Sequence, residues 1–234
     1  TWQRNYNTSS YVGPETLRNA IRKSNNVSAA QTLMTMVGVD RSVDFLLRMG
    51  VDSDHIDATP YGLSLGSSGI TPLQLTVAYG VLANAGVYQE PISFLGISAS
   101  DGNVVYDSHA QQERRQVFRP STAWMTVDMM KGVISNGTGS SAKIKGQTVA
   151  GKTGTNSDQR GVTFSGMTGW YASAIWVGHD NYRPLSSKST GNGSAAPIWQ
   201  SYMSKIHQAK NLSDRDIIEA TPNQLGIVSA TTCA

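Results

Sequence analysis

The chain has 234 residues, of which 15% are charged and 39% hydrophobic, and its formal net charge is +3. This composition fits a folded globular protein and excludes a disordered one, while the charge is too small to indicate nucleic-acid binding. No apolar run approaches the roughly 20 residues that a membrane-spanning helix needs. The sequence starts without a signal-peptide pattern or an initiating methionine, so we expect it to be a piece of a longer protein.

The first third of the chain has helical periodicity. One helix is predicted to begin at Gly13-Pro14-Glu15, a second after Asn26 with its end at Gly38, and a third from Asp40 to Gly50. The faces expected to point inward consist of Leu17, Ala20 and Ile21; Ala30, Leu33, Met34 and Val37; and Val43, Leu46 and Leu47.

The clearest helix follows Thr71, which is predicted to cap it with Gln74 in a capping box, and Gly86 is expected to end it. Residues 92–106 then contain two β-like runs around Asp101-Gly102, which is a hairpin signal.

A helix from about Ser121 to Ile134, with Trp124, Val127 and Met130 inward, precedes three predicted strands. The strands are Gln147–Thr153, Val162–Thr168 and Trp170–Val177, and the last two are expected to pair as an antiparallel hairpin around Gly169. Residues 186–196 read as a short flexible loop, and a closing helix is predicted over Pro197–Ala209. The order of elements indicates an α+β fold.

Residues that commonly hold metals are few and scattered. The only cysteine, Cys233, can form no disulfide within the chain, and His55, His109, His179 and His207 lack the spacing of metal ligands. We therefore expect neither a metal site nor a cofactor.

Two short motifs carry the chemistry. Taken alone, Ser24-x-Asn26 indicates only a helix cap, and the stretch AGKTGT at residues 150–155 indicates only a surface turn. In this order, however, Ser-x-Asn and Lys152-Thr153-Gly154 are motifs of penicillin-binding proteins and serine β-lactamases. From about Arg4 to Met203 the chain resembles the transpeptidase domain of class A (bifunctional) penicillin-binding proteins. The likeness is carried by RNY, TLRNAIRKSNNVSAAQTL, SLGSSGITPLQLTVAYGVLANAGVYQEP, GTGSSAKI, VAGKTGT, AIWVGHDN and APIW.

The resemblance implies the fold of penicillin-binding proteins and serine β-lactamases, in which helices flank an antiparallel sheet beside an all-helical subdomain. Residues 1–210 would be the C-terminal part of that domain, helical to about 135 and forming the sheet from about 145, and residues 211–234 would be a tail. The helix with the nucleophile and the first two strands would lie upstream of this chain. Without them, we expect Trp170–Val177 to expose an apolar, unpaired edge.

The resemblance also implies a peptidoglycan D,D-transpeptidase that works through a serine acyl-enzyme and is acylated by β-lactams. Ser24 would relay a proton, Asn26 would hydrogen-bond the catalytic lysine and the substrate amide, and Lys152 would supply a fixed cation for the substrate carboxylate. On a strand, Thr153 and Thr155 face one side and could bind that carboxylate, while Gly154 allows close approach. The backbone N–H of Thr155 would form half of the oxyanion hole. We expect Ser24 Oγ to lie within about 8 Å of the Lys152 side chain.

Two departures from the family pattern stand out. The family's Ser-x-x-Lys nucleophile motif comes before Ser-x-Asn, and none is found before Ser24. The Ser-x-x-Lys at Ser140–Lys143 comes after Ser24 and is read as chance or helix capping. In addition, Gly161-Val162-Thr163-Phe164 replaces an Asp-x-Trp-Phe-like run, which puts the rim near Arg160–Thr163 in doubt.

Three other functions remain open. A class A β-lactamase needs a glutamate with asparagine four residues on, but Glu90 and Glu113 are followed at that spacing by Phe94 and Val117. A D,D-carboxypeptidase would keep the same motifs, and a non-catalytic peptidoglycan- or β-lactam-binding module would keep the fold. The expected partners are stem peptides ending in D-Ala-D-Ala, β-lactams and the upstream segment with the nucleophile. The resemblance further implies a parent protein with a membrane anchor and a glycosyltransferase domain, and places this piece outside the cell.

Overall fold

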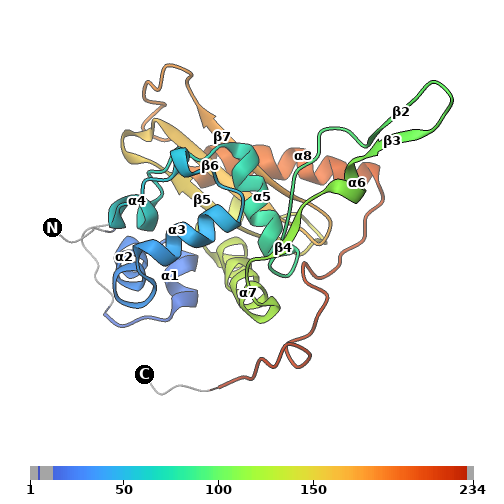
Figure 1. Ribbon diagram of the computed structural model, residues 1–234. Coiled ribbons are helices and arrows are strands. Elements are labelled where there is room, and N and C mark those ends of the chain that lie inside the picture. The colour runs from blue at the N-terminus through green and yellow to red at the C-terminus, as the bar shows by residue number, and fades with distance from the viewer. Residues whose placement is uncertain (1–4, 6–12, 231–234) are drawn as a thin grey trace.

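The computed structural model describes residue 5 and residues 13–230, which form helices around one three-stranded sheet and two short two-stranded ones (Figure 1). The main sheet is antiparallel in the order β5-β6-β7, with bounds Ala150–Thr155, Gly161–Met167 and Ala172–Gly178. The predicted α+β fold and antiparallel strands are thus confirmed.

The turn between β6 and β7 is longer than predicted. The backbone N–H of Thr168 donates to the carbonyl of Tyr171 at 2.8 Å, so the turn spans Thr168–Tyr171 instead of Gly169 alone. The buried Thr168 hydroxyl holds it, accepting from the N–H groups of Trp170 and Tyr171 at 3.2 Å each. Trp170 was predicted within the strand but lies in this turn, where its ring stacks on the guanidinium of Arg215.

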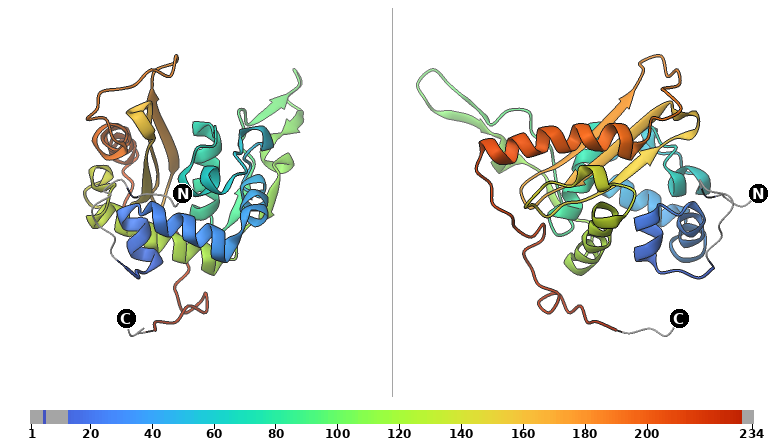
Figure 2. Two further views of the ribbon diagram at one scale, coloured as in Figure 1. Left: turned by 90° about the vertical axis from the view of Figure 1, so that its left-hand side faces the viewer. Right: turned by 180° about the vertical axis from the view of Figure 1, so that it is seen from behind.

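Helix α8 (Ala196–Ala209) covers one face of the sheet (Figure 2). Trp199 is fully buried and packs edge to face on Phe164 of β6, with 5.2 Å between ring centroids. Residues 191–195 were expected to be part of a flexible loop, but they form the π-helical turn η5 (Gly191–Ala195). This turn packs on the sheet, since a Cβ at Gly191 would lie 2.7 Å from the Thr163 carbonyl oxygen.

The opposite face of the sheet meets helix α7 (Pro120–Asn136), which confirms the helix predicted over residues 121–134. Val127 and Met130 of this helix are buried against Ala150 of β5 and Met167 of β6. The segment expected to be a tail also contributes to this core, through Ile217 and Ile218, which are both buried there.

Helix α5 (Pro72–Ala83) confirms the predicted capping box between Thr71 and Gln74. The expectation of an unpaired edge on the last strand holds in part, because no described strand lies beyond β7. Helix α5 lies against β7, and the hydroxyl of Thr76 accepts from the Ala174 N–H at 3.0 Å. A helix thus occupies part of the edge that we expected to be bare, although Trp176 stays 40% exposed.

The remaining helices of the first third are α1 (Leu17–Lys23), α2 (Asn26–Thr32), the π-helical η1 (Leu33–Val37) and α3 (Val39–Arg48). Helix α1 begins later than predicted because Thr16 caps it by accepting from the Asn19 N–H. Met34 was expected inward but is 58% exposed, because the wider π-helical winding shifts its direction. Leu47 is likewise exposed, since α3 packs through Phe45, which stacks on Phe118.

Several short elements were not predicted. They are η2 (Ser53–His55), α4 (Pro60–Leu65), β1 (Val87–Gln89) with its partner β4 (Arg114–Gln116), α6 (Ser108–Gln111), η3 (Ser140–Ala142) and η4 (Ser157–Gln159). Among them, α4 matters most for the site described below.

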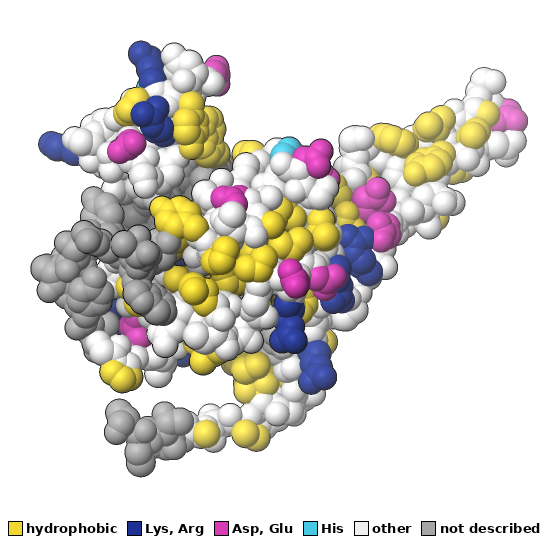
Figure 3. Space-filling view, turned by 60° about the vertical axis from the view of Figure 1, so that its left-hand side comes forward, with side chains coloured by type: hydrophobic (Ala, Val, Ile, Leu, Met, Phe, Trp, Pro, Cys, Tyr) yellow, Lys and Arg dark blue, Asp and Glu magenta, His cyan; other side chains and the backbone are white. Residues whose placement is uncertain are grey.

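The predicted hairpin is confirmed as β2 (Gly96–Ser98) paired with β3 (Val104–Asp107), with Gly102 at φ 87° in the turn. It projects from the body, and hydrophobic side chains lie along it (Figure 3). These exposed side chains are Phe94, Leu95, Ile97, Val104, Val105 and Tyr106. Within the described residues, no helix combines the length and apolarity that crossing a bilayer requires.

Candidate active site

Ser24 sits in the turn between α1 and α2. It ends α1 in the left-handed conformation, at φ 56° and ψ 50°, which costs a residue other than glycine about 1 kcal/mol or more. The next residue, Asn25, caps α2 by accepting from the Ser28 N–H at 3.2 Å. The helix-cap interpretation of the motif therefore applies to its middle residue, which leaves the Ser24 side chain available to the site.

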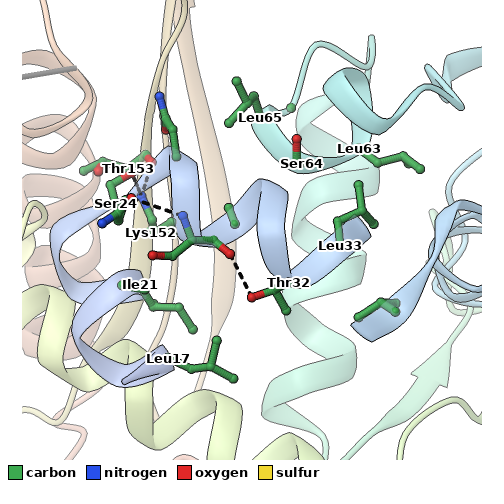
Figure 4. A pocket seen from close by; sticks show the side chains of 18 of the residues that line it. Leu17, Ile21, Ser24, Thr32, Leu33, Leu63, Ser64, Leu65, Lys152 and Thr153 are labelled. Carbon is green, nitrogen blue, oxygen red and sulfur yellow. Dashed lines mark hydrogen bonds between the residues drawn. The ribbon is translucent and has the colours of Figure 1, made fainter. Parts of the chain in front are cut away.

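Lys152 of β5 meets Ser24 across 128 positions of sequence. The ammonium of Lys152 donates to Ser24 Oγ at 2.8 Å and to the carbonyl of Thr153 at 2.9 Å (Figure 4). The expected approach of Ser24 to Lys152 within about 8 Å is thus observed. Asn26, the first residue of α2, lines the same pocket.

Burial lowers the pKa of Lys152 to about 8, because the charged ammonium loses much of its hydration there. Among the described residues, no carboxylate forms an ion pair with it. A half-buried cation without a counter-anion is suited to attract an anionic ligand group.

Alternation along the strand turns Thr153 and Thr155 to the face of β5 opposite Lys152. All three nevertheless line one pocket, because β5 lies at the edge of the described sheet. The hydroxyl of Thr155 accepts from the Gly191 N–H at 3.0 Å, so its own proton remains free to donate elsewhere. Gly154 is required by its neighbour on β6, because a Cβ there would lie 2.2 Å from Thr163 Oγ1. Besides the close approach of substrate expected from the sequence, the packing of β5 on β6 therefore also requires glycine at this position.

These residues line a pocket of about 710 Å³. Its polar lining residues include Ser24, Asn25, Asn26, Ser28 and Lys152–Thr155. The apolar lining residues Leu17, Ala20, Ile21, Leu33, Val37, Leu63, Leu65 and Tyr79 are together called the apolar side of the pocket. Neither Ser140 nor Lys143 is among the lining residues.

Sequence reasoning missed the part of the pocket wall that α4 supplies. In Figure 4, Leu63, Ser64 and Leu65 lie across the pocket from Ser24 and Lys152. A signal for α4 was present, because Thr59 precedes Pro60 and caps the helix as Thr71 caps α5 before Pro72. Nothing in the local sequence indicated that this short helix would face the site.

The rim near Arg160–Thr163 is held by the loop that follows β7. Asn156 donates to the Tyr182 hydroxyl at 2.8 Å, and Arg160 donates to the Tyr182 carbonyl at 2.9 Å. Strand β6 begins at Gly161, so the strand forms despite the departure from the Asp-x-Trp-Phe-like run. No group of three or more His, Cys, Asp or Glu that could hold a metal occurs within the described residues.

Comparison with known proteins gives consistent matches. The family described as the penicillin binding protein transpeptidase domain matches residues 1–198. Penicillin-binding protein 1A of Clostridium botulinum (strain Langeland) is 34% identical over 203 residues, which cover 84% of this chain and 24% of the relative. Penicillin-binding protein 1A of Aquifex aeolicus is 34% identical over 204 residues, covering 87% of this chain and 27% of the relative. The chain thus spans about a quarter of the length of these curated relatives.

Solved structures share the fold at lower identity. Penicillin-binding protein 1A from Haemophilus influenzae superposes with a TM-score of 0.76 at 23% identity, covering 88% of this chain and 36% of the other. PonA1 from Mycobacterium tuberculosis gives a TM-score of 0.78 at 21% identity, covering 89% of this chain and 60% of the other.

Proposed function

The chain belongs to the penicillin binding protein transpeptidase family, and we propose that it supplies the proton-relay and carboxylate-binding half of a D,D-transpeptidase active site. The reaction is acyl transfer from a stem peptide ending in D-Ala-D-Ala, through a serine acyl-enzyme, to an amine of a second peptide. β-Lactams acylate the same serine. The contact of 2.8 Å between Ser24 and Lys152 carries the proposal, because it joins two motifs that are 128 residues apart.

In this proposal, Lys152 attracts the terminal carboxylate of the donor peptide and favours the charge that develops during acylation. Ser24 accepts a hydrogen bond from Lys152 and passes a proton toward the leaving amine. Asn26 orients the substrate amide and the lysine that accompanies the nucleophile. Thr153 and Thr155 donate to the carboxylate through their hydroxyls, and the Thr155 N–H contributes to the oxyanion hole.

The nucleophile and its lysine belong to a helix upstream of Ser24 in the proposed enzyme. The apolar side of the pocket, formed by α1, η1, α4 and α5, is the surface on which that helix would pack. The serine at the start of the helix would then face Ser24 and Lys152.

The test is covalent labelling of the intact protein with fluorescent penicillin, followed by incubation with a stem pentapeptide and an amine acceptor. A transpeptidase releases D-Ala and forms the peptide–amine product, which mass spectrometry detects. Release of D-Ala without that product would indicate a carboxypeptidase. No labelling and no release would leave a non-catalytic binding module and refute the proposal.

We place the active site on the outer side of the cytoplasmic membrane, where peptidoglycan is cross-linked, with attachment through an upstream anchor. A protease added to intact spheroplasts should then remove an epitope tag fused near the C-terminus. A tag that stays protected until the cells are lysed would contradict this location.

The lowered pKa of Lys152 predicts that the rate of acylation depends on pH. This pKa of about 8 means that the side chain is mostly protonated at neutral pH and loses its charge as the pH rises through 8. If the cation attracts the carboxylate, the second-order rate of acylation by benzylpenicillin should decline above pH 8. In Lys152→Arg the cation persists at high pH, so the decline should disappear even if the rate is lower throughout. A wild-type rate that stays constant between about pH 7 and pH 9 would contradict the role of this charge.

A further inference from the structure

The segment Gly137-Thr138-Gly139, directly after α7, is locked to the end of helix α1. The Thr138 N–H donates to the carbonyl of Arg22 at 3.2 Å, and the Gly139 N–H donates to the carbonyl of Val133 at 3.0 Å. There is no room for a side chain at Gly137, since a Cβ there would lie 2.6 Å from the Arg22 oxygen. The backbone of Thr138 is therefore fixed to Arg22, which lies two residues before Ser24 in sequence.

The side chain of Thr138 reaches the other motif. Thr153 Oγ1 donates to Thr138 Oγ1 at 3.1 Å, and both residues are half-buried. On its other side Thr153 is confined by η5, because a Cβ at Gly191 would lie 2.9 Å from the Cβ of Thr153. A single residue thus connects the end of α1 with the strand that carries Lys152, through its backbone on one side and its hydroxyl on the other.

A threonine hydroxyl has one proton to donate and can accept two hydrogen bonds. In the structure, the Thr153 hydroxyl donates its proton in the hydrogen bond to Thr138. A carboxylate only accepts, so Thr153 must turn its proton toward that ligand when it binds. The Thr138 hydroxyl can then reverse its role and donate to Thr153. This exchange leaves both oxygens partnered and keeps the Thr153 oxygen in place.

We propose that Thr138 is a positioning residue that aims the Thr153 hydroxyl at the ligand carboxylate and so sets the preference for ligands that carry one. The inference rests on the proposed function and deepens it. It predicts that loss of the Thr138 hydroxyl weakens recognition of the carboxylate while leaving the reactivity of the nucleophile unchanged.

The experiment uses the intact protein and two probes, benzylpenicillin and its methyl ester, which lacks the free carboxylate. The quantity measured is the second-order acylation rate of benzylpenicillin divided by that of its methyl ester. Thr138→Val keeps the shape of the side chain but removes the hydroxyl, and we expect the ratio to fall about 5- to 10-fold, as loss of one ordinary hydrogen bond does. Thr138→Ser keeps the hydroxyl and should retain the wild-type ratio.

The matched control is Thr126→Val on α7, where the lost hydroxyl bonds only to the Thr122 carbonyl within the helix. It should leave the ratio unchanged. Equal slowing of both probes by Thr138→Val, or a ratio that falls as much in Thr138→Ser, would overturn the inference and show a packing role. If Thr138→Val does not fold, Thr138→Ala is measured in the same way. A wild-type protein that neither probe acylates refutes the proposed function itself, which is a distinguishable result.

Discussion

Replacing Lys152 by alanine in the intact protein is expected to slow acylation by β-lactams by on the order of 100-fold or more, as the loss of one anion-stabilising donor does. Lys152 donates hydrogen bonds to the hydroxyl of Ser24 and to the Thr153 carbonyl, and it forms no ion pair with any described carboxylate. In the proposed function this charge attracts the carboxylate of the ligand. The substitution removes the cation and also leaves Ser24 without the donor that orients its hydroxyl.

The measurement is the second-order rate of labelling with fluorescent penicillin, with the melting temperature recorded beside it. Lys205→Ala is the control, because Lys205 is an exposed lysine on α8 outside the pocket. It should label at the wild-type rate. If Lys152→Ala also labels at that rate, Lys152 does not take part in acylation. If its melting temperature falls in step with the rate, the lysine acts by stabilising the fold.

Local patterns predicted the local parts of this structure well. The capping box of Thr71 and Gln74 was predicted because both partners lie within four residues of sequence. The strand β6 was likewise predicted, over Val162–Thr168, and on it Phe164 and Val162 face α8. The boundaries were less accurate where one buried side chain decides the turn, as Thr168 does between β6 and β7.

The site itself was predicted by motif order and resemblance and not by local physics. Nothing in the residues around Ser24 indicates that a strand 128 positions later brings Lys152 to 2.8 Å from its hydroxyl. The contact between Thr138 and Thr153 was missed for the same reason, since long-range side-chain pairs leave no periodic trace in sequence. The position of α5 beside β7, where the Thr76 hydroxyl accepts from the Ala174 N–H, was missed for the same reason.

We also expect that residues 1–234, expressed alone, are not labelled by penicillin and do not melt cooperatively. In the family the nucleophile motif precedes Ser-x-Asn, and this chain has no such motif before Ser24. Its only Ser-x-x-Lys, at Ser140–Lys143, lies in and beside η3 and does not line the pocket. Ser24 lies in the pocket and is hydrogen-bonded to Lys152. Lys152 is the donor in this bond, however, so it cannot at the same time act as the base that removes the proton of Ser24.

The open pocket should destabilise the isolated chain more than the sheet edge does. Helix α5 covers part of the β7 edge, whereas the apolar side of the pocket has no covering element among the described residues, and Leu17 on it is 49% exposed. Each large apolar side chain left in water forgoes roughly 1.5–3 kcal/mol. Against a net stability of about 5–15 kcal/mol, a few such losses suffice to unfold a domain.

Supplying the upstream segment as a separate chain should therefore restore cooperative melting and labelling by penicillin together. The experiment compares residues 1–234 alone with the same chain co-expressed with the upstream part of its protein, by thermal unfolding and by labelling with fluorescent penicillin. Ser24→Ala and Ser140→Ala in the isolated chain identify the serine responsible if any label appears. A cooperative melt with covalent labelling of the isolated chain would contradict the expectation. Loss of that label in Ser140→Ala would then show that the nucleophile lies on this chain after all, outside the pocket that contains Lys152.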